Sequence, residues 1–272
     1  MEKVIFENIE YNIYKDIVES TDSIEVAVAW FTNQRIFNLL CEKLRKRNGA
    51  NVSIIMVNDP INIKKGGVDW QKYIELGGKL FLSSDDKLMH HKFCVLDSKI
   101  LYNGSYNWTY GAEEKNIENV IRFEDQQGLI KDFQIHFNQL KEKVGLVEEV
   151  KYYSVEELEQ WISSKDATFT NELKYEWEEN IKTNQNGTKD IEDLLIKLGV
   201  LSDDSIVKIK KKNLRNKNTG VCKKCGNEKE YSNKPLCLKC FRSCRRCGNP
   251  KEYDKHLLCL SCYKTCPGKI IG

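Results

Sequence analysis

The first 145 residues alternate between short apolar stretches and longer amphipathic ones, and this alternation leaves few possible folds. Ser23–Trp30 alternates apolar and polar residues, as a strand does, whereas Gln34–Arg47 has its apolar residues at helical spacing. The pattern predicts further strands at 51–57, 79–82, 92–97, 100–102 and 119–123, and further helices at 69–76 and 129–143. Strands that alternate with helices indicate an α/β fold, a sheet covered by helices, over residues 1–145.

The next segment, 146–204, has a mostly helical pattern and carries no residues that suggest chemistry. Ser154 and Glu157 are spaced as in a capping box, and Asp190–Leu198 predicts a further helix. We interpret this segment as a helical connector, or as an element for specificity or dimer formation. Residues 205–220 are rich in lysine and are expected to form a flexible basic linker.

Charge is divided unevenly along the chain. From Ser205 onward 14 Lys and 4 Arg stand against 4 acidic residues, whereas the first 204 residues carry 25 basic and 36 acidic side chains. A basic tail on an acidic body favours contact with a polyanion such as nucleic acid. A tail that only improves solubility is the alternative.

Within residues 221–272 a 22-residue unit occurs twice, and each copy contains two CxxC pairs separated by 11 residues. Four thiolates at this spacing are typical of structural zinc, so we expect two zinc ions. The expected ligands are Cys222, Cys225, Cys237, Cys240, Cys244, Cys247, Cys259 and Cys262. The two CxxC pairs that bind one zinc ion could come from the same repeat or from both repeats, and Cys266 or His256 could replace one ligand. The Lys, Arg and Tyr residues between the pairs suit nucleic acid, although a ribbon that binds protein is an alternative.

The stretch 89–119, MHHKFCVLDSKILYNGSYNWTYGAEEKNIEN, combines residue types that can cleave a phosphodiester. His90 and Lys92 are two residues apart at the start of an expected strand, so alternation places them on the same face. Asp97 follows within the same stretch, and Ser105, Asn107 and Glu118 come after the Asn103-Gly104 turn.

These residues resemble the HxKx4D motif of the phospholipase D superfamily, followed by its GSxN element and a later NxEN run. The resemblance extends over roughly residues 5–143 and is closest to members with a single motif, which include small bacterial endonucleases and the mitochondrial cardiolipin-hydrolase-like group. It implies a phospholipase D-like mixed sheet flanked by helices, to which the connector and a small zinc-ribbon tail are added.

Elementary chemistry assigns roles to the same residues. Phosphodiester cleavage needs a nucleophile, an acid for the leaving oxygen and neutralisation of the phosphoryl oxygens. The neutral imidazole of His90 is the expected nucleophile, and Lys92 supplies positive charge. Ser105 and Asn107 can donate hydrogen bonds to phosphoryl oxygens. Glu118 is expected to accept a hydrogen bond from Nδ1 of His90 and so present Nε2 to the substrate.

A single copy of this set lacks a separate acid for the leaving group. A homodimer with two-fold symmetry supplies one, because it can bring two copies of His90 to one shared site. Single-motif relatives imply the same arrangement, with no catalytic metal.

Several nearby residues are better interpreted as structural. His91 is expected on the opposite face from His90, and His136 is expected to have a packing role. Cys94 is expected to be buried and inert, and Trp30 and Trp108 to belong to the core. Asp97 is expected to orient Lys92 or cap the turn rather than touch substrate.

The sequence thus predicts a metal-independent phosphodiesterase domain in residues 1–145 and a tail that binds nucleic acid. The simplest interpretation is a DNA or RNA nuclease. A phospholipase acting on an anionic lipid such as cardiolipin is the alternative, because the same residues would cleave it. A nucleic-acid-binding module with restrained or absent catalysis is a third. The sequence contains no apolar run long enough to span a membrane and no secretory signal, so we expect a cytoplasmic protein without stable membrane association.

Overall fold

The computed structural model describes residues 1–45, 50–84, 88–165, 167–183 and 188–217. Its contacts divide the chain into two compact units, Met1–Leu201 and Ser202–Gly272. Residues 146–201 of the connector therefore belong to the same unit as the sheet.

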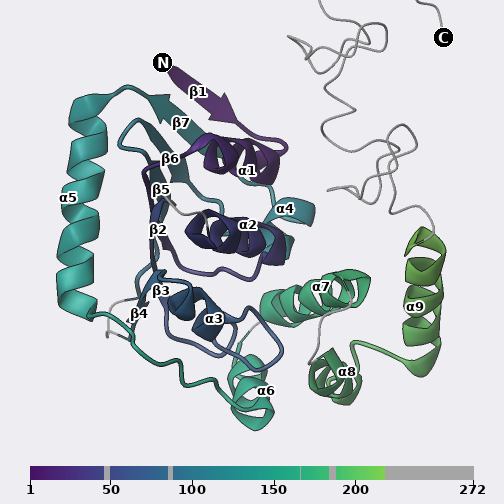
Figure 1. Ribbon diagram of the computed structural model, residues 1–272. Helices are drawn as coiled ribbons and strands as arrows, with labels where there is room; N and C mark the ends of the chain where they lie inside the picture. Colours follow the sequence, from purple (N-terminus) through teal and green to yellow (C-terminus); the bar gives the residue numbers. More distant parts are fainter. Residues whose placement is uncertain (46–49, 85–87, 166, 184–187, 218–272) are drawn as a thin grey trace, which may run out of the picture. The chain divides into compact units, whose positions relative to one another are not determined.

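Within the described residues, seven strands form one mixed sheet in the order β1-β7-β6-β5-β2-β3-β4 (Figure 1). Parallel pairing joins β2 to β3 and β3 to β4, and the other neighbouring strands pair antiparallel. This confirms the predicted mixed α/β architecture. The strands are β1 (Glu2–Ile5), β2 (Ser23–Val28), β3 (Asn51–Val57), β4 (Lys79–Ser83), β5 (Lys92–Leu96), β6 (Ile100–Gly104) and β7 (Val120–Glu124).

Helices cover both faces of the sheet (Figure 1). Figure 1 shows α5 alone on one face, with α1, α2 and α3 on the other. The helices of the first unit are α1 (Ile9–Glu19), α2 (Gln34–Arg45), α3 (Trp70–Glu75), α4 (Tyr110–Glu114), α5 (Gln127–Val144), α6 (Val155–Ser163), α7 (Ala167–Thr183) and α8 (Thr188–Lys197). The sequence pattern did not predict β1, α1 or α4.

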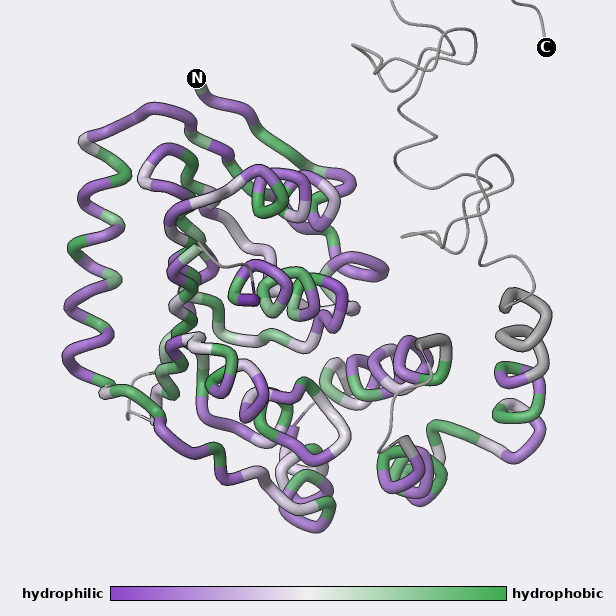
Figure 2. The backbone as a smooth tube through the Cα atoms, in the orientation of Figure 1, coloured by the Kyte–Doolittle hydropathy of each residue, from purple (hydrophilic) through white to green (hydrophobic). Residues whose placement is uncertain are grey.

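Two hydrophobic clusters lie on opposite faces of the sheet, and strand alternation divides their residues. In β2, Ile24, Val26 and Val28 face α1 and α2, whereas Ala27 joins Ile130 and Phe137 of α5. Figure 2 shows the same pattern, with hydrophobic segments concentrated along the strands and hydrophilic turns on the outside of the helices. All of these clustered side chains are buried, so the sheet is a rigid platform for its loops.

The connector helices pack onto the sheet domain through buried polar contacts. Glu172 of α7 accepts hydrogen bonds from Thr32 Oγ1 at 2.5 Å and from the backbone of Gly111 at 2.6 Å. Glu176 of the same helix pairs with the buried Lys64 at 2.6 Å. Helix α6 begins with the predicted capping box, because Ser154 and Glu157 each bond the other's backbone.

In the second unit, α9 spans Asp203–Lys217. The prediction of a flexible linker from 205 was therefore wrong for most of that segment. Ser202 caps the helix by accepting from the backbone N–H of Ser205 at 3.3 Å, and Asp203 and Asp204 place negative charge at its start. Lysine itself is a good helix former, so lysine richness does not by itself indicate a linker.

Candidate active site

Five segments from distant parts of the sequence meet at one edge of the sheet. Strand β5 runs antiparallel to β2 with Lys92 opposite Val28, so the start of β5 lies beside the end of β2. The end of β6 lies beside the start of β7 in the same way, with Gly104 opposite Val120. A bridge between Phe31 and Trp108 joins the loops that follow β2 and β6. The loop after β3 completes this edge.

His90 and Lys92 occupy this edge on the face predicted from alternation. Cys94, the next residue on that face, is buried in the cluster beneath α1 and α2. The imidazole of His90 is exposed, and the indole of Trp30 lies near both site residues. The ring centroids of His90 and Trp30 are 5.6 Å apart, and Lys92 Nζ is 5.9 Å from the centroid of the Trp30 ring. His90 is therefore open to a ligand while its surroundings are fixed.

The surroundings of His90 favour its neutral form. Partial burial and then the positive charge of Lys92 lower the pKa of His90 below its ordinary value. Burial also lowers the pKa of Lys92, which the negative charge of Glu118 partly opposes. An imidazole that stays unprotonated at neutral pH has a free lone pair for attack on phosphorus.

Ser105 and Glu118 meet at the same edge, but not as predicted. Ser105 Oγ donates a hydrogen bond to Glu118, and Asn116 Nδ2 donates to the other carboxylate oxygen at 3.0 Å. Within the described residues Glu118 thus binds Ser105 and Asn116 in place of His90. The sequence spacing did not reveal this, because Ser105 and Glu118 become neighbours only through the pairing of β6 with β7.

Gly104 is what permits this approach. A Cβ at this position would lie 2.1 Å from the backbone oxygen of Asn119, a distance that no side chain tolerates. The glycine of the GSxN element therefore brings the turn before β7 against Ser105, whose Oγ accepts from the backbone N–H of Asn119 at 3.1 Å. Glu118 is thereby held close enough for its negative charge to act on the half-buried Lys92.

Asn107 lies in the loop after β6. Its side-chain oxygen accepts a hydrogen bond from the backbone N–H of Trp30 at 3.3 Å. This contact uses the carbonyl oxygen, so the NH2 group is the part of Asn107 that can donate to a phosphoryl oxygen.

Asp97 is the predicted site residue that the structure does not bring to this edge. It lies at the opposite end of β5, where it accepts hydrogen bonds from Ser20 Oγ at 2.7 Å and from the backbone N–H groups of residues 21–23 at 2.8 to 2.9 Å. At about 3.3 Å per residue, five residues of strand separate Asp97 from Lys92 by about 16 Å. Asp97 therefore fixes the start of β2.

His91 and His136 lie together on the other face. Their Nε2 atoms are 3.0 Å apart, and His91 packs against Phe93 of the α5 cluster. In the described part of the chain, no second imidazole therefore accompanies His90 at the edge.

Trp30 and Trp108 differ in position although both were predicted to belong to the core. Trp108 is buried against Phe31, in agreement with the prediction. Trp30 is half-buried, contacts His90, and donates from Nε1 to Asp59 at 2.9 Å. Trp30 belongs to the site because it lies in the loop that follows β2, at this edge of the sheet.

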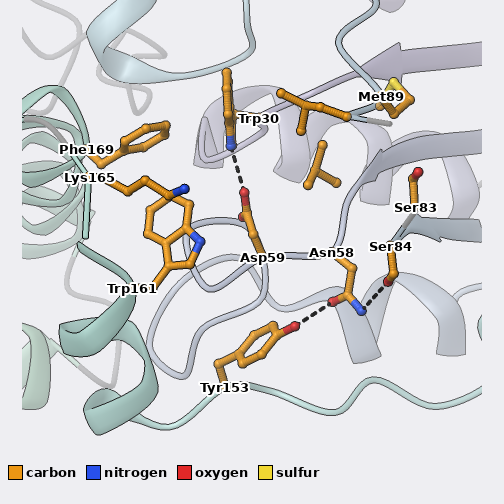
Figure 3. A pocket seen from close by; sticks show the side chains of 12 residues that line it. Trp30, Asn58, Asp59, Ser83, Ser84, Met89, Tyr153, Trp161, Lys165 and Phe169 are labelled. Carbon is orange, nitrogen blue, oxygen red and sulfur yellow. Dashed lines mark hydrogen bonds between the residues drawn. The ribbon is translucent and has the colours of Figure 1, made fainter. Parts of the chain in front are cut away.

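A cavity of about 480 Å³ is lined by Trp30, the residue that contacts His90, and the sequence pattern gave no indication of this cavity (Figure 3). Trp161, Lys165 and Phe169 of the connector form one wall, and Trp30 and Asp59 form another. The signal that could have indicated it is the pair of aromatic residues at 161 and 169, which flank the α6–α7 junction in an otherwise polar segment.

The eight predicted zinc ligands lie outside the described residues, so the zinc sites remain a prediction. Among the residues that the structure does describe, no group of three or more His, Cys, Asp or Glu is arranged to hold a metal ion. Cys41 and Cys94 are buried free thiols, and burial raises the pKa of both.

Residues 13–141 match the family model described as "Cardiolipin synthase, PLD-like domain". This segment of the chain is therefore similar to a phospholipase D-like domain. The matched segment includes all six predicted site residues and ends before the connector wall of the cavity.

Known proteins similar to this chain include two named mitochondrial cardiolipin hydrolase. That of Chlamydomonas reinhardtii is 35% identical over 121 residues, which are 44% of this chain and 52% of the relative. That of Danio rerio is 28% identical over 130 residues, which are 48% of this chain and 56% of the relative. The chain therefore spans about half the length of these relatives.

A solved structure, the phospholipase D family member Nuc from Salmonella typhimurium, aligns with 55% of this chain and 100% of its own at 21% identity. Its TM-score of 0.47 is too low to support an inference about function. Among the described residues, no helix has the length and apolar character needed to cross a membrane.

Proposed function

We propose that this chain is a metal-independent nuclease that hydrolyses DNA or RNA through a phosphohistidine on His90. The observation that supports it best is the gathering of His90, Lys92, Asn107 and the Ser105–Glu118 pair at one open edge of the sheet. A neutral nucleophile, a fixed positive charge and hydrogen-bond donors are the groups that phosphoryl transfer requires.

The reaction has two displacements. Nε2 of His90 attacks phosphorus and forms a P–N bond as the P–O bond to the leaving group breaks, and an acid protonates that oxygen. Water then attacks the phosphohistidine, loses its proton to the same group acting as a base, and releases His90. Lys92 and Asn107 neutralise the phosphoryl oxygens in both steps.

We propose that His90 of the partner subunit is this acid and base, in a homodimer with one shared site. His91 and His136 bind each other on the α5 face of the sheet, so neither is placed to protonate the leaving oxygen beside His90. A two-fold axis at the exposed edge would bring two copies of His90 together. The basic tail, with its expected zinc ribbons, would hold the nucleic acid.

A phospholipase acting on an anionic lipid is the second candidate. Two large apolar residues next to site residues favour it, since Leu88 is 56% exposed and Ile117 is fully exposed. Exposed apolar side chains can enter a lipid surface. The names of the relatives also point to cardiolipin.

The test is an assay in EDTA with labelled DNA, labelled RNA and cardiolipin vesicles, comparing the wild type with His90→Ala. We expect cleavage of DNA or RNA by the wild type alone, with an acid-labile adduct on His90 found by mass spectrometry. Cleavage of cardiolipin alone would favour the second candidate. Cleavage of none by a folded protein would contradict both.

The shared site is tested with a heterodimer of one wild-type and one His90→Ala subunit, purified through two different tags. A shared site predicts activity far below half that of the wild type. Half of the wild-type activity would show that the subunits work independently.

A further inference from the structure

The cavity that Trp30 lines next to His90 has an aromatic wall that lies outside the matched segment 13–141. Trp161 and Phe169 belong to the α6–α7 region, whereas Trp30, Asp59 and Met89 belong to the loops of the sheet (Figure 3). The connector is held there by the buried contacts of α7 described above, so this wall is fixed relative to His90.

A continuous series of rings leads from His90 into the cavity. The centroids are 5.6 Å apart for His90 and Trp30, 5.1 Å for Trp30 and Phe169, and 4.8 Å for Phe169 and Trp161. Each ring contacts the next edge to face. Trp161 and Phe169 are only half-buried, so parts of their surfaces are open to a ligand.

Each end of this series carries a positive charge. Lys92 Nζ lies 5.9 Å from the Trp30 ring, and Lys165 Nζ lies 5.4 Å from the Trp161 ring. Polar groups line the space between them, including the Asp59 carboxylate and the Asn58 amide. The site thus offers stacking surfaces, hydrogen-bonding groups and two cations.

We propose that this cavity binds the base of a nucleotide next to the scissile phosphate in a single-stranded nucleic acid. Trp161 and Phe169 provide the stacking surface, and Lys165 binds the following phosphate. The proposal rests on the proposed function, because it takes His90 as the position of the scissile phosphate.

The chemistry of the cavity favours a base over a lipid chain. A base has flat faces for the rings and polar edges that can bond the remaining lone pairs of Asp59 and Asn58, whereas an acyl chain offers polar groups no hydrogen bond. The two side chains already pair with Trp30, Ser84 and Tyr153, so the base adds to an existing polar lining. A base within a duplex is stacked and paired, so its face can reach Trp161 only from a single strand.

The experiment measures binding to the full-length His90→Ala chain, which does not consume its ligand. Two probes are compared: a short single-stranded oligonucleotide, and an oligomer of equal length and charge with abasic sugars throughout. The difference between the two affinities isolates the contribution of the bases from that of charge. Additional Trp161→Ala, Phe169→Ala and Trp161→Phe substitutions test the wall, and their melting curves check folding.

We expect Trp161→Ala to weaken oligonucleotide binding about tenfold, the loss of one stacked base, with little change for the abasic oligomer. Trp161→Phe should restore most of the loss. Lys165→Gln should weaken both probes alike and reduce the salt dependence by about one counterion, whereas Lys131→Gln on α5 should do neither.

The proposal would be overturned if a folded Trp161→Ala chain lost no affinity for either probe, or lost the same affinity for both. Weaker binding to cardiolipin vesicles without weaker binding to the oligonucleotide would assign the cavity to a lipid. If the base-dependent binding is found but the wild type cleaves no nucleic acid, the cavity assignment stands and the proposed nuclease fails.

Discussion

The two ends of strand β5 carry parts of one sequence motif and are built in opposite ways. At one end, Asp97 accepts four hydrogen bonds and holds the residues that begin β2. At the other end, His90 is exposed, and Lys92 Nζ donates to the backbone oxygen of His90 at 3.0 Å. The difference indicates that a compact motif can combine an anchor with reactive groups, each placed by the strand between them.

The largest effect is expected at the reactive end. His90→Ala should reduce kcat by at least about 1,000-fold, because it removes the proposed nucleophile, and should leave the melting temperature nearly unchanged. The measurement is a cleavage assay together with a thermal melt.

His91→Ala is the matched control for this substitution, since it removes the adjacent imidazole from the other face of the sheet. It should keep most of the activity. Equal losses of activity in His90→Ala and His91→Ala would show that the two faces of the sheet do not differ in function.

Gly104→Ala tests whether the reactive end also depends on backbone fit. Its Cβ would force the backbone of Asn119 away and separate Ser105 from Glu118. We expect kcat/KM to fall about 10- to 100-fold, as for other displacements of about 1 Å near a reacting centre. Gly128→Ala on α5, where a Cβ meets nothing within 4 Å, should change little. Full activity in Gly104→Ala would show that the Ser105–Glu118 pair is dispensable.

Asp97→Ala should act on stability rather than on chemistry. Loss of its hydrogen bonds should lower the free energy of unfolding by about 2 kcal/mol, measured by urea titration. The activity of the folded fraction should stay within about threefold of the wild type, because the site lies at the far end of the strand. Asp22→Ala is the control, since Asp22 contributes only its backbone N–H to this network. A large loss of kcat in folded Asp97→Ala would show that the Asp97 end of β5 also takes part in the reaction.

The same anchor should weaken in acid. Burial alone raises the pKa of Asp97, but the hydrogen bonds from Ser20 and from the backbone outweigh it and hold the pKa below its ordinary value. A carboxyl whose pKa is lower in the folded state stabilises the fold above its unfolded pKa of about 3.9, and this is lost as the pH falls through the folded pKa. Wild type and Asp97→Ala should therefore converge in stability below about pH 4.

The smallest effect is expected in the pH profile of the reactive end. Partial burial and the charge of Lys92 lower the pKa of His90, so His90 stays neutral to a lower pH than a free imidazole. The acid limb of kcat/KM should therefore have its midpoint below about 6.5. A midpoint above that value would show that negative charge, such as that of Glu118, dominates the environment of His90.

Much of the fold and part of the site could be predicted because they depend on local patterns. Strand alternation placed His90, Lys92 and Cys94 on one face and His91 on the other, and helical spacing located α2 and α5. The separation of Asp97 from the site could also have been predicted, since a strand extends by a fixed length per residue. The linker prediction failed because charge alone does not exclude a helix.

The sequence by itself determined the chemical groups, their spacing and the face of the strand on which each one lies, because backbone geometry repeats every two residues in a strand. Only the tertiary structure decided which distant groups meet. The pairing of β6 with β7 joins Ser105 to Glu118, and the docking of α7 brings Phe169 against Trp30, the residue that contacts His90. Such contacts depend on how separate elements pack, and no local periodicity encodes that packing.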